Sequence, residues 1–106
     1  MVPLFVQIDL SFNDIGGYED EDGVMIYAPE GPGAIANALR VSASLTAINL
    51  GWNGIGAEGA KNIAEGIAVS ASLTAADLRY NCLDDVAEQG LRDVVKDRAS
   101  FTLDLR

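Results

Sequence analysis

Apolar residues recur at a fixed spacing in residues 45–72, LTAINLGWNGIGAEGAKNIAEGIAVSAS. The first part has the order L-x-x-L-x-L-x-x-N-x-L, carried by Leu45, Ile48, Leu50, Asn53 and Ile55. Ile48 and Leu50 are two residues apart, so they point to the same face of a short strand. We expect Asn53 to turn the chain by hydrogen bonding to backbone groups of its own loop and of the next coil.

From Gly56 onward the apolar period changes from that of a strand to that of a helix. The apolar positions follow the spacing i, i+3, i+4 and i+7 at Ala60, Ile63, Ala64 and Ile67. Polar residues take the other side, at Glu58, Lys61, Asn62 and Glu65. The unit is therefore predicted to be a strand, a loop, a helix and a return turn.

The same order of residues occurs before and after this unit. The earlier copy contains Phe5, Ile8, Leu10, Asn13 and Ile15, and the later one contains Leu73, Ala76, Leu78, Asn81 and Leu83. Leu50 and Leu78 are 28 residues apart, but Leu10 and Leu50 are 40 apart, so the first copy holds an insertion. We divide the single domain, 1–106, into 5–44 with an insertion at about 16–30, then 45–72, 73–99 and a terminal strand at 100–106.

Two further helices are predicted from the same register. The first has its apolar face at Ile35, Ala36 and Leu39, with Pro32 near its first turn. The last carries Glu88 and Arg92 where the middle helix has Ala60 and Ala64. Charged side chains at these positions predict solvent on that flank, as at the end of an array.

The stretch ASLTAINLGWNGIGAEGAKNIAEGIAVSASLTAADLRYN resembles the ribonuclease-inhibitor-like class of leucine-rich repeats, which also occurs in the sensing regions of NOD-like receptors. The resemblance covers nearly the whole chain apart from the insertion and the first few residues. It implies an α/β fold: a right-handed solenoid forming a short horseshoe segment, with a concave parallel sheet and an outer row of helices. It also implies a role in binding proteins.

Composition narrows the possible functions. The net charge of −9, from 7 basic and 16 acidic residues, disfavours nucleic acid and favours a protein partner with a basic surface. With no histidine and one cysteine, the chain lacks the usual nucleophilic and zinc-binding sets, so we expect no enzyme activity, cofactor or metal. No apolar run reaches the length of about 18 residues that spans a membrane. The unpaired Cys82 favours a reducing, cytoplasmic location and is interpreted as a semi-exposed passenger.

Three aromatic residues occupy the place just before the repeated asparagine: Phe12, Trp52 and Tyr80. At strand spacing they would lie in a row along the concave rim. They could simply stack and shield the loop asparagines, or they could form a ridge that binds a partner, and the two roles can coexist. The asparagine ladder itself, formed by Asn13, Asn53 and Asn81, is explained by its structural role.

A polar row lies beside the aromatic row and is predicted to face the concave side. Its members are Asp9, Asn49, Asp77 and Asp104, and Arg79 and Arg106 add the only positive charge expected there. Asp77 and Asp104 could stand about 5 Å apart, as in retaining glycosidases, but an open sheet neither excludes water nor raises a carboxyl pKa. The predicted partner-binding residues are therefore Phe12, Trp52, Tyr80, Asp9, Asn49, Asp77 and Arg79.

The insertion is predicted to form a small hairpin with an acidic tip at Glu19–Asp22 and a strand at Val24–Ala28. Asp20, Asp22 and Gly23 fit three places of a calcium loop. Tyr18 and Pro29 stand where its first and last carboxylates belong, and Glu30 is one residue late. A solvated loop is the favoured interpretation, with calcium as the alternative.

The first strand is expected to leave an open sheet edge, with Val2, Leu4 and Val6 on or beside it. Such an edge suggests self-association or a chain cut from a longer protein. The leading functional hypothesis is a protein-interaction module that uses the concave face and the aromatic rim. The alternatives are a regulator of an enzyme, such as a GTPase activator, and a C-terminal capping fragment of a longer repeat array.

Overall fold

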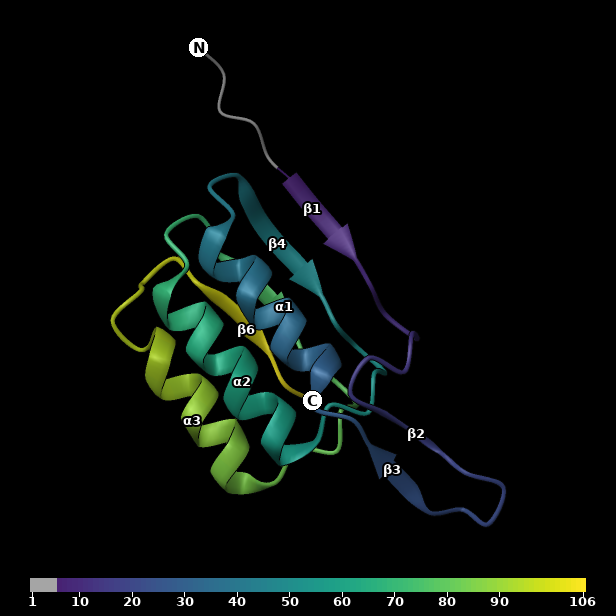
Figure 1. Cartoon of the computed structure of the whole chain (residues 1–106). Helices are drawn as coiled ribbons and strands as arrows, with labels where there is room; N and C mark the ends of the chain where they lie inside the picture. Colours follow the sequence, from purple (N-terminus) through teal and green to yellow (C-terminus); the bar gives the residue numbers. More distant parts are fainter. Residues whose placement is uncertain (1–5) are drawn as a thin grey trace.

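The computed structural model, which describes residues 6–106, is built on a parallel sheet of four strands (Figure 1). The strands are β1 (Val6–Asp9), β4 (Leu45–Asn49), β5 (Ala75–Asp77) and β6 (Thr102–Asp104), in that spatial order. The register confirms the predicted alignment of Ile8, Ile48, Ala76 and Leu103, which are neighbours on successive strands. The predicted place of Phe5 opposite Leu45 is wrong, because the register shifts between Val6 and Gln7 and Leu45 pairs with Val6. Phe5, Val2 and Leu4, which were assigned to the first strand or its edge, lie outside the described residues.

Three helices cover one face of this sheet (Figure 1). They are α1 (Glu30–Val41), α2 (Gly56–Val69) and α3 (Asp85–Val95). The core lies between the layers, where Leu50 and Leu78 meet Ile63, Ile67 and Leu91 from the helices, all fully buried. The parallel sheet and its helices confirm the mixed α/β prediction. The opposite side of the sheet, which we call the open face, carries none of these three helices.

Small residues set the distance between the first two helices. A Cβ added at Gly66 would lie 2.8 Å from the Cα of Ala36, and one added at Gly59 would lie 2.9 Å from Pro32. No side chain larger than glycine fits at either point without moving α1. The 28-residue step therefore matters for packing, because it brings a glycine of one helix to the backbone of the helix before it.

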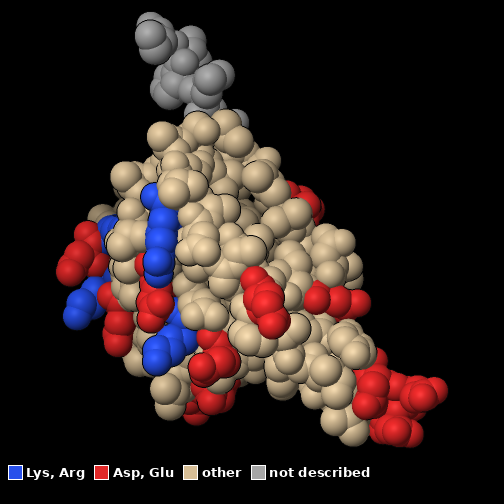
Figure 2. All heavy atoms as spheres, viewed as in Figure 1, with Lys and Arg blue, Asp and Glu red and all other residues tan. Residues whose placement is uncertain are grey.

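The predicted hairpin is confirmed. Strands β2 (Gly17–Glu19) and β3 (Met25–Tyr27) pair antiparallel and project away from the sheet, and acidic side chains gather at their tip (Figures 1 and 2). The base of the hairpin is held by the Gly16 N–H, which donates to the Asn53 carbonyl at 2.8 Å. The Tyr27 ring lies against Gly56, where a Cβ would come within 2.6 Å of its Cε1. Gly56 also has φ +70°, so both the backbone conformation and the close contact with Tyr27 favour glycine there.

The last helix corrects one expectation. Glu88 is only 4% exposed, although its charge predicted a solvent-facing flank. The Arg106 guanidinium donates to both Glu88 carboxylate oxygens, at 2.7 and 3.1 Å. These bonds are the main cause that lowers the pKa of Glu88. A buried carboxylate is tolerable when it is paired in this way, whereas Arg92 is exposed as expected.

Candidate functional site

The loops that follow the strands are held together by the repeated asparagine. The Asn53 side-chain oxygen accepts the N–H groups of Asn13 and Ile15 at 2.8 and 3.2 Å. Its amide group donates to the carbonyls of Leu10 and Leu50 at 2.8 and 2.9 Å. The structural role of this residue is confirmed, but the direction was wrong. The side chain reaches the preceding coil and not the next one.

Asn81 repeats the arrangement one coil later. Its oxygen accepts the N–H groups of Asn53 and Ile55 at 2.9 and 3.3 Å, and its amide group donates to Leu50 and Leu78. Among the residues that the structure describes, Asn13 makes only the bonds within its own loop that Asn53 and Asn81 also make, to Leu10 and to Ser11. Each buried asparagine therefore fixes the loop of the coil before it.

The residue before each asparagine has a left-handed backbone, which the residue pattern did not predict. Phe12, Trp52 and Tyr80 have φ of 62°, 59° and 60°. This conformation is disfavoured for residues with a Cβ, and here it occurs at three bulky aromatics. The backbone is held in place because the Phe12 N–H donates to Gly51 and the Trp52 N–H donates to Arg79, at 3.0 and 3.1 Å. As a result, the side chain leaves the loop toward solvent.

The three aromatic rings form a continuous stack, which we call the aromatic ridge: Phe12, Trp52 and Tyr80. The Phe12 and Trp52 ring centroids are 5.5 Å apart with planes at 11°, and those of Trp52 and Tyr80 are 4.2 Å apart at 21°. The residues nevertheless stay 71%, 50% and 56% exposed. The predicted stacking is confirmed. The ridge also leaves much of its apolar surface in water, while Asn53 and Asn81 beneath it are buried.

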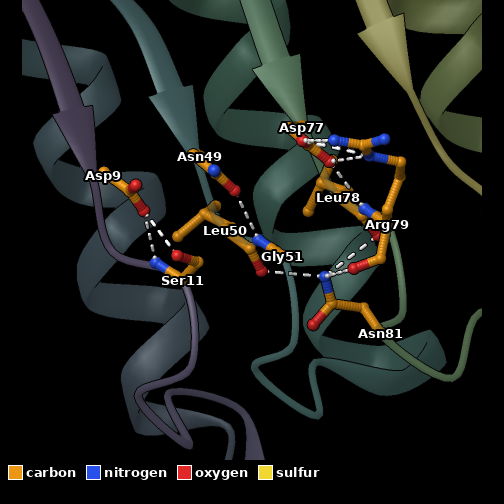
Figure 3. Close-up of polar contacts among 9 residues, drawn as sticks. All are labelled: Asp9, Ser11, Asn49, Leu50, Gly51, Asp77, Leu78, Arg79 and Asn81. Carbon is orange, nitrogen blue, oxygen red and sulfur yellow. Dashed lines mark hydrogen bonds and ion pairs between the residues drawn. The ribbon is translucent and has the colours of Figure 1, made fainter.

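The predicted polar row is aligned across the sheet, since Asp9, Asn49, Asp77 and Asp104 are register partners. Figure 3 shows how the first three are used. The Asp9 Oδ1 accepts the Ser11 N–H at 2.9 Å, and Asn49 and Asp77 accept the N–H two residues later at 2.9 and 3.0 Å. Each side chain therefore closes the turn that ends its strand. This common task explains the residue type at these positions.

Arg79 lies within this row and is already paired. Its guanidinium makes a two-pronged contact with Asp77, at 2.8 Å for the shortest bond (Figure 3). Partial burial raises the pKa of Asp77, but the bonds and charge of Arg79 outweigh it, so the net pKa is lowered. The Ser11 hydrogen bonds lower the pKa of Asp9. Both carboxylates are therefore ionised at neutral pH and are poor general acids.

The sequence pattern predicted that Arg106 would add positive charge to this row, and that prediction is wrong. Its guanidinium is directed to Glu88 on α3. The correction has a simple cause: Glu88 is buried and needs a cation, whereas Asp77 already has Arg79. Among the described residues, Arg79 is the cation that the structure pairs with the polar row.

The polar row borders a shallow hollow of about 370 Å³ on the open face. The small side chains of Ala47 and Ala75 lie in its lining, between Gln7 on β1 and Thr102 on β6. A segment lying here would therefore meet alanine side chains and the polar row.

The other candidate groups are placed as follows. Cys82 is exposed, with φ of 59°, in the loop after β5. Burial is the main reason that the pKa of Tyr27 is raised, and the neighbouring Cys82 adds to the shift.

In the hairpin, the Asp20 Oδ1 accepts the N–H groups of Asp22 and Val24, each at 2.9 Å. Within residues 6–106, no three acidic or cysteine side chains come together as a metal site would require.

Comparison with known proteins gives one finding. A family model described as Leucine Rich repeat matches residues 41–64, which contain β4, the loop with Trp52 and Asn53, and the first part of α2. No curated protein sequence matches the chain. None of the helices in the described part of the chain is long and apolar enough to cross a membrane. The match supports a leucine-rich repeat protein.

Proposed function

We propose that this leucine-rich repeat chain is a protein-interaction module that binds its partner through the aromatic ridge and the open face of the sheet. Leucine-rich repeats generally mediate contacts between proteins. The observation that carries the proposal is the exposed stack of Phe12, Trp52 and Tyr80. Three stacked rings form a rigid apolar surface that loses little conformational freedom on binding, and aromatic residues often supply binding energy at interfaces.

The cost of holding the ridge in place supports a binding role. Three aromatic residues occupy left-handed backbone conformations, each of which costs about 1–2 kcal/mol for a residue with a Cβ. The ladder through Asn53 and Asn81 compensates for that cost without burying the rings. Backbone strain that presents a side chain to solvent is typical of functional positions.

The partner we propose has a basic surface. The chain carries a net charge of −9, and the polar row next to the ridge holds Asp9 and Asp104 on the two outer strands. Asp77 is paired with Arg79, whereas Asp9, within residues 6–106, bonds only to Ser11 of its own turn. A cation of the partner can therefore approach Asp9 without breaking an ion pair. Asn49 and Arg79 would contribute polar contacts at the centre of the row.

We assign the array to the ribonuclease-inhibitor-like class, with a right-handed solenoid and a concave open face. The 28-residue step and the full α-helix in each repeat support this assignment. Cytoplasmic location stays a prediction from the single cysteine.

Binding is favoured over catalysis by the state of the polar groups. The lowered pKa values of Asp9 and Asp77 keep both carboxylates charged, and each is committed to a turn. In the alternative of a GTPase activator, Arg79 would be the arginine offered to the partner's phosphates. Arg79 would first have to leave its contact with Asp77 at 2.8 Å.

The test uses a ridge variant in which Phe12, Trp52 and Tyr80 are all replaced by alanine. Immobilised chain captures partners from a native lysate, and mass spectrometry compares this variant with the unchanged chain and with Val86→Ala, an exposed apolar control on α3. We expect a partner that the control retains and the ridge variant loses, with circular dichroism showing that both are folded. Equal capture by all three chains would refute the proposal.

Trp52 offers a direct second measurement, because it is the only tryptophan in the chain. It lies at the centre of the ridge, so its fluorescence reports on that surface alone. Adding the purified partner should shift its emission to shorter wavelength as the ring loses water. Added salt should weaken the binding, since the proposed contacts include surface charges.

A further inference from the structure

The two ends of the sheet differ in how well they cover the core. On β1, Ile8 is 42% exposed, although its register partner Ile48 on β4 is only 5% exposed. On α1, Ile35 is half-buried, whereas Ile63 on α2, 28 residues later, is fully buried. The outer side of β1 and α1 is therefore an unfinished apolar surface. We call it the β1–α1 flank, formed by Val6, Gln7, Ile8, Ile35 and Ala38.

The opposite end carries charge. There Glu88 on α3 is buried, and Arg106 pairs with it just after β6. The β1–α1 flank, by contrast, contains no ionisable side chain. On a chain with a net charge of −9, an uncharged surface is where a second copy meets the least repulsion.

The positions on α1 match those that already form a helix contact elsewhere in the array. Gly66 of α2 lies against the Ala36 backbone of α1. The residue 28 positions before Gly66 is Ala38, which is exposed. The methyl group of Ala38 leaves room for a second helix to pack closely against α1 at this point.

We propose that the β1–α1 flank binds the same flank of a second copy of this chain. A two-fold axis perpendicular to the sheet places the two β1 strands antiparallel and joins the sheets into one. Because the axis keeps both sets of helices on the same side, the apolar side chains of the two copies meet in a common core. Such a contact is isologous and closes after two copies.

Side-chain alternation and the charge of Asp9 together select the register of this contact. Directly opposed residues of an antiparallel pair point to the same face, so Ile8 must oppose a core-facing residue. A register centred on Gln7 sets Val6 of one copy opposite Ile8 of the other. It also leaves the two Asp9 side chains about 14 Å apart along the strands, beyond the screening length of about 8 Å in physiological salt.

The competing arrangement is head to tail, with β1 of one copy beside β6 of the next. Continuing the observed register would place Asp9 beside Asp104, about 4.8 Å away, and add like charges to an already acidic row. It would also bring Ile8 to the end of the core that carries Glu88. Charge therefore favours the two-fold contact over an open chain of copies.

Cross-linking tests the register in a Cys82→Ser background. In the proposed register, Gln7 faces itself across the axis, so Gln7→Cys should form a disulfide-linked dimer under mild oxidation. Thr102→Cys is the matched control, because Thr102 occupies the same row on the other outer strand. We expect severalfold more dimer from Gln7→Cys. Equal yields from the two variants would overturn the proposal.

Sedimentation of the unchanged chain tests the association itself. The apparent mass should rise with concentration from that of one chain to that of two and stop there. Ile8→Asp should keep the chain monomeric. Gln7→Lys should do the same by opposing two like charges, without touching the core. Val86→Asp on α3 should associate normally. A chain that stays monomeric throughout, grows beyond two copies, or ignores both β1 variants would refute the two-fold contact.

Discussion

The asparagine ladder allows a quantitative test, because the three asparagines have the same place in the repeat but different partners. Replacing Asn81 by alanine removes the acceptor of the Asn53 and Ile55 N–H groups, and both residues are buried. A buried donor left without a partner costs about 1–3 kcal/mol. With two such donors, we expect Asn81→Ala to lower the free energy of unfolding by about 4 kcal/mol.

Asn53→Ala should cost less. It releases the N–H groups of Asn13 and Ile15, which are exposed and half-buried, so water can replace part of the loss. The expected cost is about 2 kcal/mol. The Leu50 carbonyl keeps the amide of Asn81 as its donor, so loss of the Asn53 amide adds little there. Asn13→Ala removes only two bonds within its own exposed loop and should cost less than about 0.5 kcal/mol.

Urea denaturation followed by circular dichroism measures all three variants on the same scale. The midpoints should fall in the order Asn13→Ala, Asn53→Ala and Asn81→Ala, with Asn81→Ala the least stable. The order follows from the burial of the N–H groups that Asn53 and Asn81 accept from the preceding coil. Within the described residues, Asn13 bonds only inside its own loop. If Asn13→Ala proves as costly as Asn81→Ala, the bonds within each loop would be what matters, and the reasoning would be wrong.

The remaining predictions concern two glycines and one ion pair. Gly56→Ala should lower the free energy of unfolding by at least about 1–2 kcal/mol, since φ is +70° and the new Cβ would meet the Tyr27 ring. Gly90→Ala lies within α3 with nothing near its Cβ position and should raise that free energy by about 0.5–1 kcal/mol, so urea midpoints should move in opposite directions. The pKa of Glu88 in the folded chain lies below its ordinary value of 4.5, so the stabilisation from Arg106 is complete above pH 4.5 and disappears as the pH falls through the folded-state pKa. Arg106→Ala should therefore lower the melting temperature more at neutral pH than in acid, and an equal loss at both would contradict this.

Several features of the site could be predicted from residue spacing alone. The repeated pattern around the asparagine was enough to place Phe12, Trp52 and Tyr80 in a row. The 28-residue step from Leu50 to Leu78 also aligned Asp77 with its neighbours on the sheet. The hairpin was equally local, since an acidic tip and a glycine followed by a strand-like segment predicted it. These predictions succeeded because a repeat stacks at a constant step, so equal positions in the sequence become neighbours in space.

Other features depend on tertiary contacts that residue spacing does not predict. The sequence determined by itself that Glu88 replaces an alanine, but only the tertiary structure decided that Arg106 would pair with it and not with the polar row. The left-handed backbone at Trp52 and the contact of Tyr27 with Gly56 were likewise decided in three dimensions. Periodicity determines which face a side chain occupies. The partner that a buried charge or a strained loop finds depends on which distant atoms the folded chain brings within hydrogen-bonding range.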